Sequence, residues 1–167
     1  KYGDKNEWLV FDTQDTKQTK NISKLSSASW IARSIYFDKK ILEFISVNPY
    51  ATIVNVGCGL DTTFDRIDNG KIDWIDLDLP DAIELRKQYF QESGRRRFVA
   101  KSVFDTTWYD EIKTRDKVML LVAGVIYYFD ESEARKLFGQ IHAFIPDSEV
   151  ILDYASRLGI KLSNEQV

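Results

Sequence analysis

Short apolar runs alternate along the chain with longer stretches in which apolar residues recur every three or four positions. The runs predict five strands, at residues 53–56, 74–78, 97–101, 118–122 and 150–153. Helical spacing predicts a first helix over residues 28–47, and a second helix is expected after the turn that begins at Gly57. A third helix is predicted to begin at Pro80. A fourth is predicted to begin at a capping box formed by Asp130 and Glu133 and to end at Pro146. This alternation predicts an α/β fold with a parallel, doubly wound sheet.

The apolar positions of these helices indicate which residues they bury. In the first helix the positions at helical spacing are Trp30, Ile31, Ile35, Ile41, Leu42 and Ile45. The helix from Pro80 is expected to bury Leu79, Ile83 and Phe90, with Tyr89 as a further candidate. The helix after Asp130 is expected to bury Ala134, Leu137, Phe138, Ile141 and Phe144.

The first predicted strand ends at Gly57 and Gly59, and about 20 residues later the second ends at Asp76 and Asp78. The glycines permit a tight turn and a close approach of backbone to a ligand, and the N–H groups of the helix that follows would face an anionic group. The two carboxylates point to the same side of their strand and can accept hydrogen bonds from a ribose. Because Thr62 stands where dinucleotide-binding turns have a third glycine, the turn favours S-adenosylmethionine over NAD.

Five longer segments around this turn are spread over most of the chain, at residues 54–66, 68–80, 82–87, 100–105 and 123–129. Together they resemble the leucine carboxyl methyltransferase family. The family includes eukaryotic enzymes that methylate protein phosphatases and bacterial O-methyltransferases of the polyketide-synthesis type. The resemblance implies a class I, Rossmann-like methyltransferase sheet with S-adenosylmethionine as cofactor.

The resemblance also implies roles for individual residues. Gly57 is expected at the methionine part of the cofactor, Asp78 at the ribose, Ser102 and Val103 at the adenine, and Arg33 at the carboxylate. A guanidinium suits the last role because it binds a carboxylate through two parallel hydrogen bonds. The strand ends supply four further candidates for cofactor binding, which are Gly59, Asp61, Asp76 and Ala123.

One position departs from the family pattern. Many members carry a glutamate at the end of the fourth strand, where it holds the cofactor's amino group, and this chain has Ala123 followed by Gly124. A methyl group cannot accept a hydrogen bond. Either a backbone carbonyl takes this role, or the cofactor binds more weakly, or the domain is not catalytic.

Candidates for catalytic residues are few. Tyr127 and Tyr128 follow the fourth strand and are candidates for the acceptor pocket, although aromatic packing explains them equally well. His142 falls on a helix away from the strand ends, and Cys58 is expected to be a small turn residue rather than a nucleophile. Without a general base, the sequence favours a carboxylate acceptor or a readily ionised phenol.

Composition limits the remaining classes. The chain has 167 residues, 44% of them hydrophobic, a net charge of −3 and one cysteine. The acidic balance argues against a nucleic-acid partner, no apolar run reaches the length of a membrane span, and the single cysteine favours the cytoplasm. The basic triplet Arg95-Arg96-Arg97 is expected to be a solvated loop. No metal site is predicted, and the oligomeric state stays open.

Residues 1–27 are expected to form a surface segment and residues 28–167 the cofactor-binding domain. Both ends are expected to be cut, because residue 1 is not Met and the chain after Ala155 is too short for the hairpin strands that usually end such a sheet. The predicted function is O-methylation of a carboxylate or hydroxyl of a small molecule. The alternatives are an inactive cofactor-binding domain, a methyltransferase for a protein carboxyl terminus and, less favoured, a nicotinamide-dependent oxidoreductase.

Overall fold

The computed structural model describes residues 24–113 and 117–154, with side chains described from Ile31 onward. The predicted surface segment lies almost wholly outside the described residues, as does the chain after Tyr154. Within the described residues, no helix has the length and apolar character needed to cross a membrane.

The chain divides into two compact units, and we describe each by itself. One unit takes in the chain up to Val47 together with Thr62–Asp68, and it contains the first two helices of the chain, α1 and α2. The other takes in Asn48–Asp61 and the chain from Asn69 onward, and it contains the sheet.

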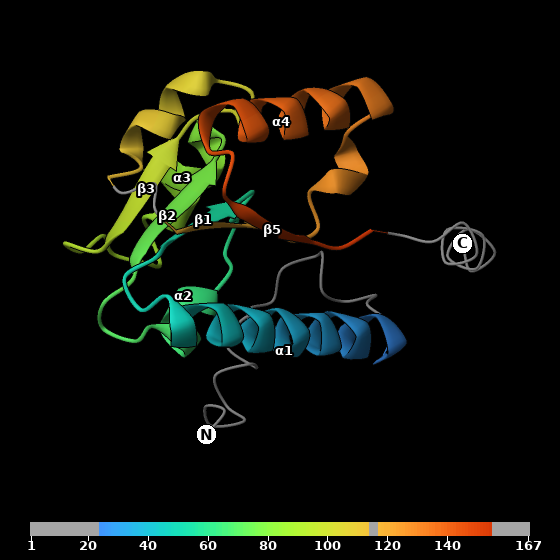
Figure 1. The fold of residues 1–167 in the computed structure, drawn as a ribbon. Helices are drawn as coiled ribbons and strands as arrows, with labels where there is room; N and C mark the ends of the chain where they lie inside the picture. The colour runs from blue at the N-terminus through green and yellow to red at the C-terminus, as the bar shows by residue number, and fades with distance from the viewer. Residues whose placement is uncertain (1–23, 114–116, 155–167) are drawn as a thin grey trace. The chain divides into compact units, whose positions relative to one another are not determined.

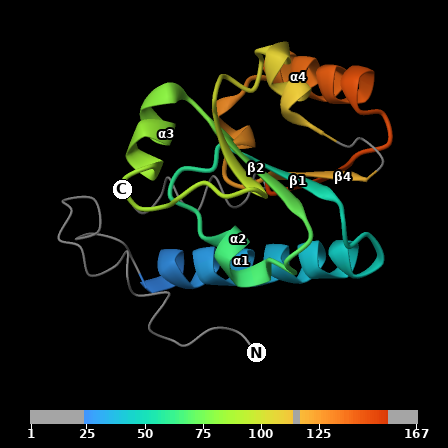
Figure 2. The same ribbon diagram turned by 90° about the vertical axis from the view of Figure 1, so that its left-hand side faces the viewer.

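The sheet unit is built on five parallel strands, as predicted (Figure 1). They are β1 (Thr52–Val56), β2 (Asp73–Asp78), β3 (Arg96–Ala100), β4 (Val118–Val122) and β5 (Glu149–Leu152). Their spatial order is β3-β2-β1-β4-β5, and Figure 2 shows β2, β1 and β4 running side by side. This is the strand order of a doubly wound fold, and its topological switch point lies between β1 and β4.

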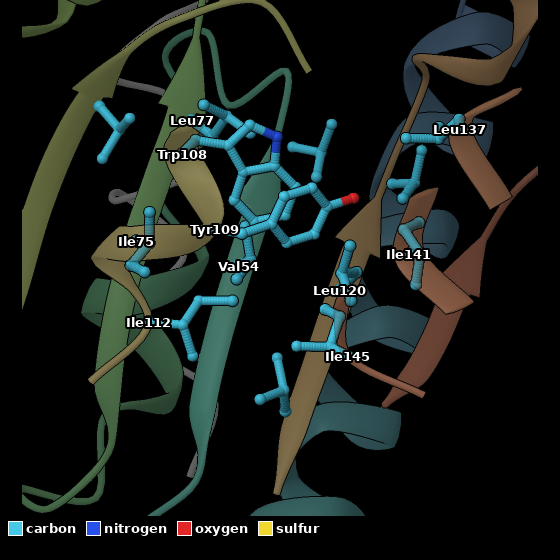
Figure 3. Packing of buried hydrophobic residues seen from close by; sticks show 14 residues of the cluster. Val54, Ile75, Leu77, Trp108, Tyr109, Ile112, Leu120, Leu137, Ile141 and Ile145 are labelled. Atoms are coloured by element: carbon cyan, nitrogen blue, oxygen red, sulfur yellow. The ribbon is translucent and has the colours of Figure 1, made fainter. Parts of the chain in front are cut away.

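One face of the sheet carries the main core. Val54, Ile75 and Leu120 point from neighbouring strands to this face, where they meet side chains of α4 (Glu131–Phe144) and of the 3-10 helix η2 (Thr106–Glu111) (Figure 3). The predicted capping box of α4 is present. Of its predicted face, Leu137 and Ile141 are buried, and Phe138 is half-buried against the same cluster. Phe144 is more exposed than predicted, with its ring stacked on Tyr109 at 4.5 Å.

The opposite face of β3 is covered by α3 (Pro80–Arg86), where Ile83 packs with Phe98 and Phe90. Two other predictions for this helix are wrong, because Leu79 and Tyr89 are about half exposed. The helix ends at Arg86, so Tyr89 lies beyond the helical periodicity, and Leu79 is the residue before the first turn. Arg86 is the side chain that α3 buries instead.

The helical unit consists of α1 (Lys24–Val47) and α2 (Thr63–Ile67). The helix predicted over residues 28–47 corresponds to α1, but only Ile41 and Ile45 of its predicted apolar positions are buried. Ile31, Ile35 and Leu42 are more than 40% exposed, Phe37 and Phe44 are buried in their place, and Trp30 precedes the described side chains. The Arg66 guanidinium on α2 donates to both carboxylate oxygens of Asp38 on α1, at 2.7 and 2.8 Å, and so joins the two helices.

The basic triplet is not a solvated loop, and this prediction is wrong. Arg96 and Arg97 belong to β3, whose parallel pairing with β2 brings them beside the carboxylates of that strand. Arg97 donates to Asp73 at 2.8 Å, and Arg96, 3% exposed, donates to Asp76 at 3.0 Å. Arg95 is half-buried and donates to a backbone carbonyl.

Candidate functional site

A cavity of about 500 Å³ opens at the carboxyl ends of the strands in the sheet unit. Residues at the ends of β1, β2, β3 and β4 all contribute to it, so it lies at the topological switch point, where ligands of open α/β sheets bind. Its lining is mostly apolar, with a small number of polar groups. The lining residues are Val56, Gly57, Leu77, Asp78, Leu79, Lys101, Ser102, Val103, Phe104, Gly124, Val125, Tyr128 and Phe129.

The glycine turn forms one wall of this cavity. Gly57 and Gly59 have φ angles of 63° and 44°, a region that L side chains rarely adopt. A Cβ atom at Gly57 would lie 2.4 Å from Cγ2 of Val125, whereas at Gly59 it would meet nothing within 4 Å. Gly57 is therefore required both by its backbone conformation and by its closeness to the chain after β4.

Asp78 reaches the cavity from the tip of β2, as predicted, and it also holds the turn. One carboxylate oxygen accepts from the backbone N–H of Gly59 at 2.8 Å, and the other accepts from the N–H of Leu79 at 2.8 Å. Asp78 is half-buried, so a ligand can still reach the carboxylate.

Ser102 and Val103 line the cavity just beyond β3, where the sequence predicts them. The neighbouring Phe104 packs against Phe129, with ring centroids 5.1 Å apart, and both rings contribute to the wall. Neither aromatic residue is among the site residues predicted from the sequence, although each follows a predicted strand. Flat apolar side chains of this kind suit a planar ring of a ligand.

Six predicted residues do not line this cavity. Gly59 and Asp61 belong to the turn behind Gly57, Tyr127 is half exposed, and Ala123 is half-buried at the end of β4. Arg33 is half-buried on α1 in the helical unit, and its predicted role at the cofactor carboxylate stays a prediction. The predicted role of the short helix α2, whose N–H groups would face an anionic group, also stays a prediction. The sixth residue is Asp76.

Asp76 is fully buried, and this does not agree with a direct contact to a ribose. One of its oxygens accepts from Asn55 at 3.2 Å and from the Trp74 indole at 2.9 Å. The other accepts from Arg86 at 2.9 Å and from Arg96 at 3.0 Å. The spacing of Asp76 and Asp78 correctly placed both on one side of β2, but the earlier residue lies too deep and its oxygens are occupied by the protein.

Cys58 and His142, the two other reactive side chains considered in the sequence, do not line the cavity. Cys58 is buried in the turn, and burial, reinforced by the negative charge of Asp76, raises the pKa of its thiol. His142 is exposed in the last turn of α4 and does not line the cavity. Lys101, Val125 and Leu79 also line the cavity and are not among the site residues predicted from the sequence, although Lys101 and Val125 stand at or just beyond the end of a predicted strand.

Comparisons with known proteins agree with this arrangement. The sequence model described as leucine carboxyl methyltransferase matches residues 3–142. The tetracenomycin polyketide synthesis O-methyltransferase TcmP of Streptomyces glaucescens is 27% identical over 139 residues, which are 80% of this chain and 52% of that protein. The S-adenosyl-L-methionine-dependent methyltransferase dpfgK of Gibberella zeae is 30% identical over 118 residues, which are 65% of this chain and 39% of that protein. The chain thus spans about half the length of TcmP and less of dpfgK.

A solved structure has the same fold. It is the N,N-8-amino-8-demethyl-D-riboflavin dimethyltransferase RosA of Streptomyces davawensis, with a TM-score of 0.55 over 93% of this chain and 49% of that one. The sequence identity is 13%, so this likeness concerns the fold alone.

Proposed function

The chain belongs to the leucine carboxyl methyltransferase family, and on that premise we propose that it forms the cofactor-binding part of an O-methyltransferase that uses S-adenosylmethionine and acts on a small molecule. The observation that carries the proposal is the cavity at the strand ends, where Gly57, Asp78, Ser102 and Val103 come together.

The cavity fits S-adenosylmethionine in size and in chemistry. Its volume of about 500 Å³ is in the usual range for ligands of this size. We propose that Asp78 accepts the ribose hydroxyls and that Ser102, Val103 and Phe104 surround the adenine, while Gly57 leaves room for the methionine part. Arg33, Gly59, Asp61 and Ala123 remain proposed cofactor residues on the strength of the family resemblance.

The cofactor, when bound, supplies a methyl group on a positively charged sulfur. The residues of this chain bind and orient it and exclude water through the apolar walls around Phe104 and Phe129. Among the described lining residues we find no histidine, and the one carboxylate, Asp78, is held by backbone N–H groups. This supports an acceptor that needs no general base, such as a carboxylate or an ionised phenol.

The relatives support a small molecule as the acceptor. TcmP is named for tetracenomycin polyketide synthesis, and we extend that substrate class to this chain as a proposal. Tyr128, which lines the cavity and is 83% exposed, and Tyr127 beside it are proposed for the acceptor side. A cytoplasmic location is proposed because Cys58, the single cysteine, is buried as a thiol.

A second candidate is a domain that binds the cofactor without catalysis. The observation in its favour is Ala123, which offers no side-chain acceptor at the position where the family resemblance implies a glutamate. Methyl transfer to a panel of polyketide phenols and carboxylic acids separates the two candidates, because the second predicts binding without any product.

Calorimetric titration tests the cofactor. We expect the protein to bind S-adenosylmethionine and not NAD. Asp78→Asn removes a charge and one acceptor, and a hydrogen bond to a charged group contributes about 1.5–3 kcal/mol, so the Kd for S-adenosylmethionine should rise at least tenfold. Asp81→Asn, at an exposed aspartate in the first turn of α3, is the matched control and should leave the Kd unchanged. A Kd within twofold of wild type in Asp78→Asn would remove Asp78 from the site.

A further inference from the structure

We infer that Arg86 is the positioning residue that holds the glycine turn, Gly57–Asp61, in the conformation that forms the cavity wall. Its consequence for affinity rests on the proposed function, since it assumes S-adenosylmethionine in the cavity. The effect on the turn itself does not depend on any ligand.

The Arg86 guanidinium binds three carbonyl oxygens of the turn. It reaches them from the last turn of α3 with its side chain fully buried. One terminal nitrogen donates to the carbonyls of Gly59 at 2.8 Å and Cys58 at 3.4 Å, and the other donates to the carbonyl of Asp61 at 2.9 Å. A single planar group therefore fixes three of the five peptide units of the turn.

The same guanidinium is anchored in the sheet. The nitrogen that binds Asp61 also donates to Asp76 at 2.9 Å, and the Nε of Arg96 donates to the same carboxylate oxygen at 3.0 Å. Both guanidiniums lie near the rings of Phe90 and Phe98, with Arg86 4.6 Å from the Phe90 centroid. The anchor therefore joins α3, β2 and β3 beneath the turn.

The buried charges of Arg86, Arg96 and Asp76 link the conformation of the turn to the position of the Arg86 guanidinium. Two buried guanidiniums share one fully buried carboxylate, so one positive charge must be stabilised by dipoles and ring faces. The carbonyls of the turn supply those dipoles to Arg86. Gly57, at the start of the same turn, lines the cavity. The arginine anchor and the cavity wall thus share one turn, and we expect a shift of Arg86 to displace the wall that a ligand meets.

A lysine cannot replace this arrangement. Its ammonium keeps the charge beside Asp76, but it is a point donor without the planar fork that reaches several carbonyls at once. Arg86→Lys therefore keeps the positive charge beside Asp76 and removes most of the hydrogen bonds to the carbonyls of the turn. Arg97→Lys is the matched control, because Arg97 also pairs with a β2 carboxylate and a backbone carbonyl, which belongs to Glu111 and not to the turn.

Amide hydrogen exchange is the decisive measurement, at denaturant concentrations where the variants have equal free energies of unfolding. In the wild type the N–H groups of Gly57, Cys58, Gly59 and Asp61 all have hydrogen-bond acceptors. We expect them to exchange at least tenfold faster in Arg86→Lys than in Arg97→Lys, with a Kd for S-adenosylmethionine at least tenfold higher. Equal exchange of the turn in the two variants overturns the inference.

A milder variant covers the case in which Arg86→Lys does not fold. Phe90→Leu removes the half-buried ring nearest to Arg86 and leaves every hydrogen bond of the guanidinium in place. We expect a two- to fivefold acceleration of exchange confined to the turn, and acceleration spread evenly over the sheet contradicts the inference. If the wild type fails to bind S-adenosylmethionine, the proposed function is wrong, and the exchange rates still decide the role of Arg86.

Discussion

Gly57 offers the sharpest test of how the cavity wall is built. In Gly57→Ala, the left-handed backbone conformation costs about 1–2 kcal/mol. The new Cβ would also lie 2.4 Å from Cγ2 of Val125, and overpacking of this kind costs about 1–3 kcal/mol. Val125 cannot easily move, because its side chain is β-branched and packs against the main core. We therefore expect the free energy of unfolding to fall by about 2–5 kcal/mol.

Further variants separate the cost of the backbone conformation from the cost of the steric contact. Gly59→Ala has open space around its Cβ, so it carries only the backbone term, about 1–2 kcal/mol. In a Val125→Ala background the steric term disappears, so Gly57→Ala should cost about 1–3 kcal/mol less there than in the wild type. Urea unfolding followed by circular dichroism measures the wild type, the three single variants and the double variant. A coupling energy below about 0.5 kcal/mol, or equal costs at Gly57 and Gly59, would refute the close contact.

Two predictions concern titrating groups. Because burial raises the pKa of Cys58, its thiolate is scarce at pH 8, and we expect thiol reagents to label it only after unfolding; rapid labelling of the folded protein would contradict its burial. Asp130→Ala should lower the Tm at pH 7 more than Asp130→Asn does, because asparagine still caps α4. The N–H of Glu133 lowers the pKa of Asp130 in the folded state, so this stabilisation is fully present above the ordinary aspartate pKa of about 4 and is lost as the pH falls below it, through the lowered pKa of the folded state. A Tm difference between wild type and Asp130→Ala that does not shrink from pH 7 to pH 3 would count against the cap.

The strands and the outline of the cavity could be predicted because both follow from local patterns. A strand buried on both faces is a continuous apolar run, and Val118–Val122 was predicted with the bounds that the structure has. Once the strands are parallel, their carboxyl ends meet at one edge, which is why the strand-end residues Asp78, Ser102 and Val103 lie around one cavity, while their roles toward the cofactor stay predictions.

The buried charges could not be predicted, because their partners are distant in sequence. Arg96 belongs to a basic triplet that resembles a surface loop, and its burial depends on Asp76, which lies 20 positions earlier. Arg86 is likewise explained only by Asp76 and by carbonyls of the turn. A charged side chain is buried only where such partners meet it, and the residue alone does not indicate this.

The two walls of the cavity differ in the length of chain that must be closed to form them. On β1, Thr52 pairs with Asp73 about 20 residues later and with Val118 about 65 residues later, so closing the second loop costs about 1 kcal/mol more conformational entropy. The wall made of the glycine turn and Asp78 is therefore a product of nearly contiguous chain. The facing wall at Gly124 and Val125 depends on a long closure through β4. A change that loosens the chain between β1 and β4 therefore disrupts the wall at Gly124 and Val125 before it disrupts the wall at the glycine turn and Asp78.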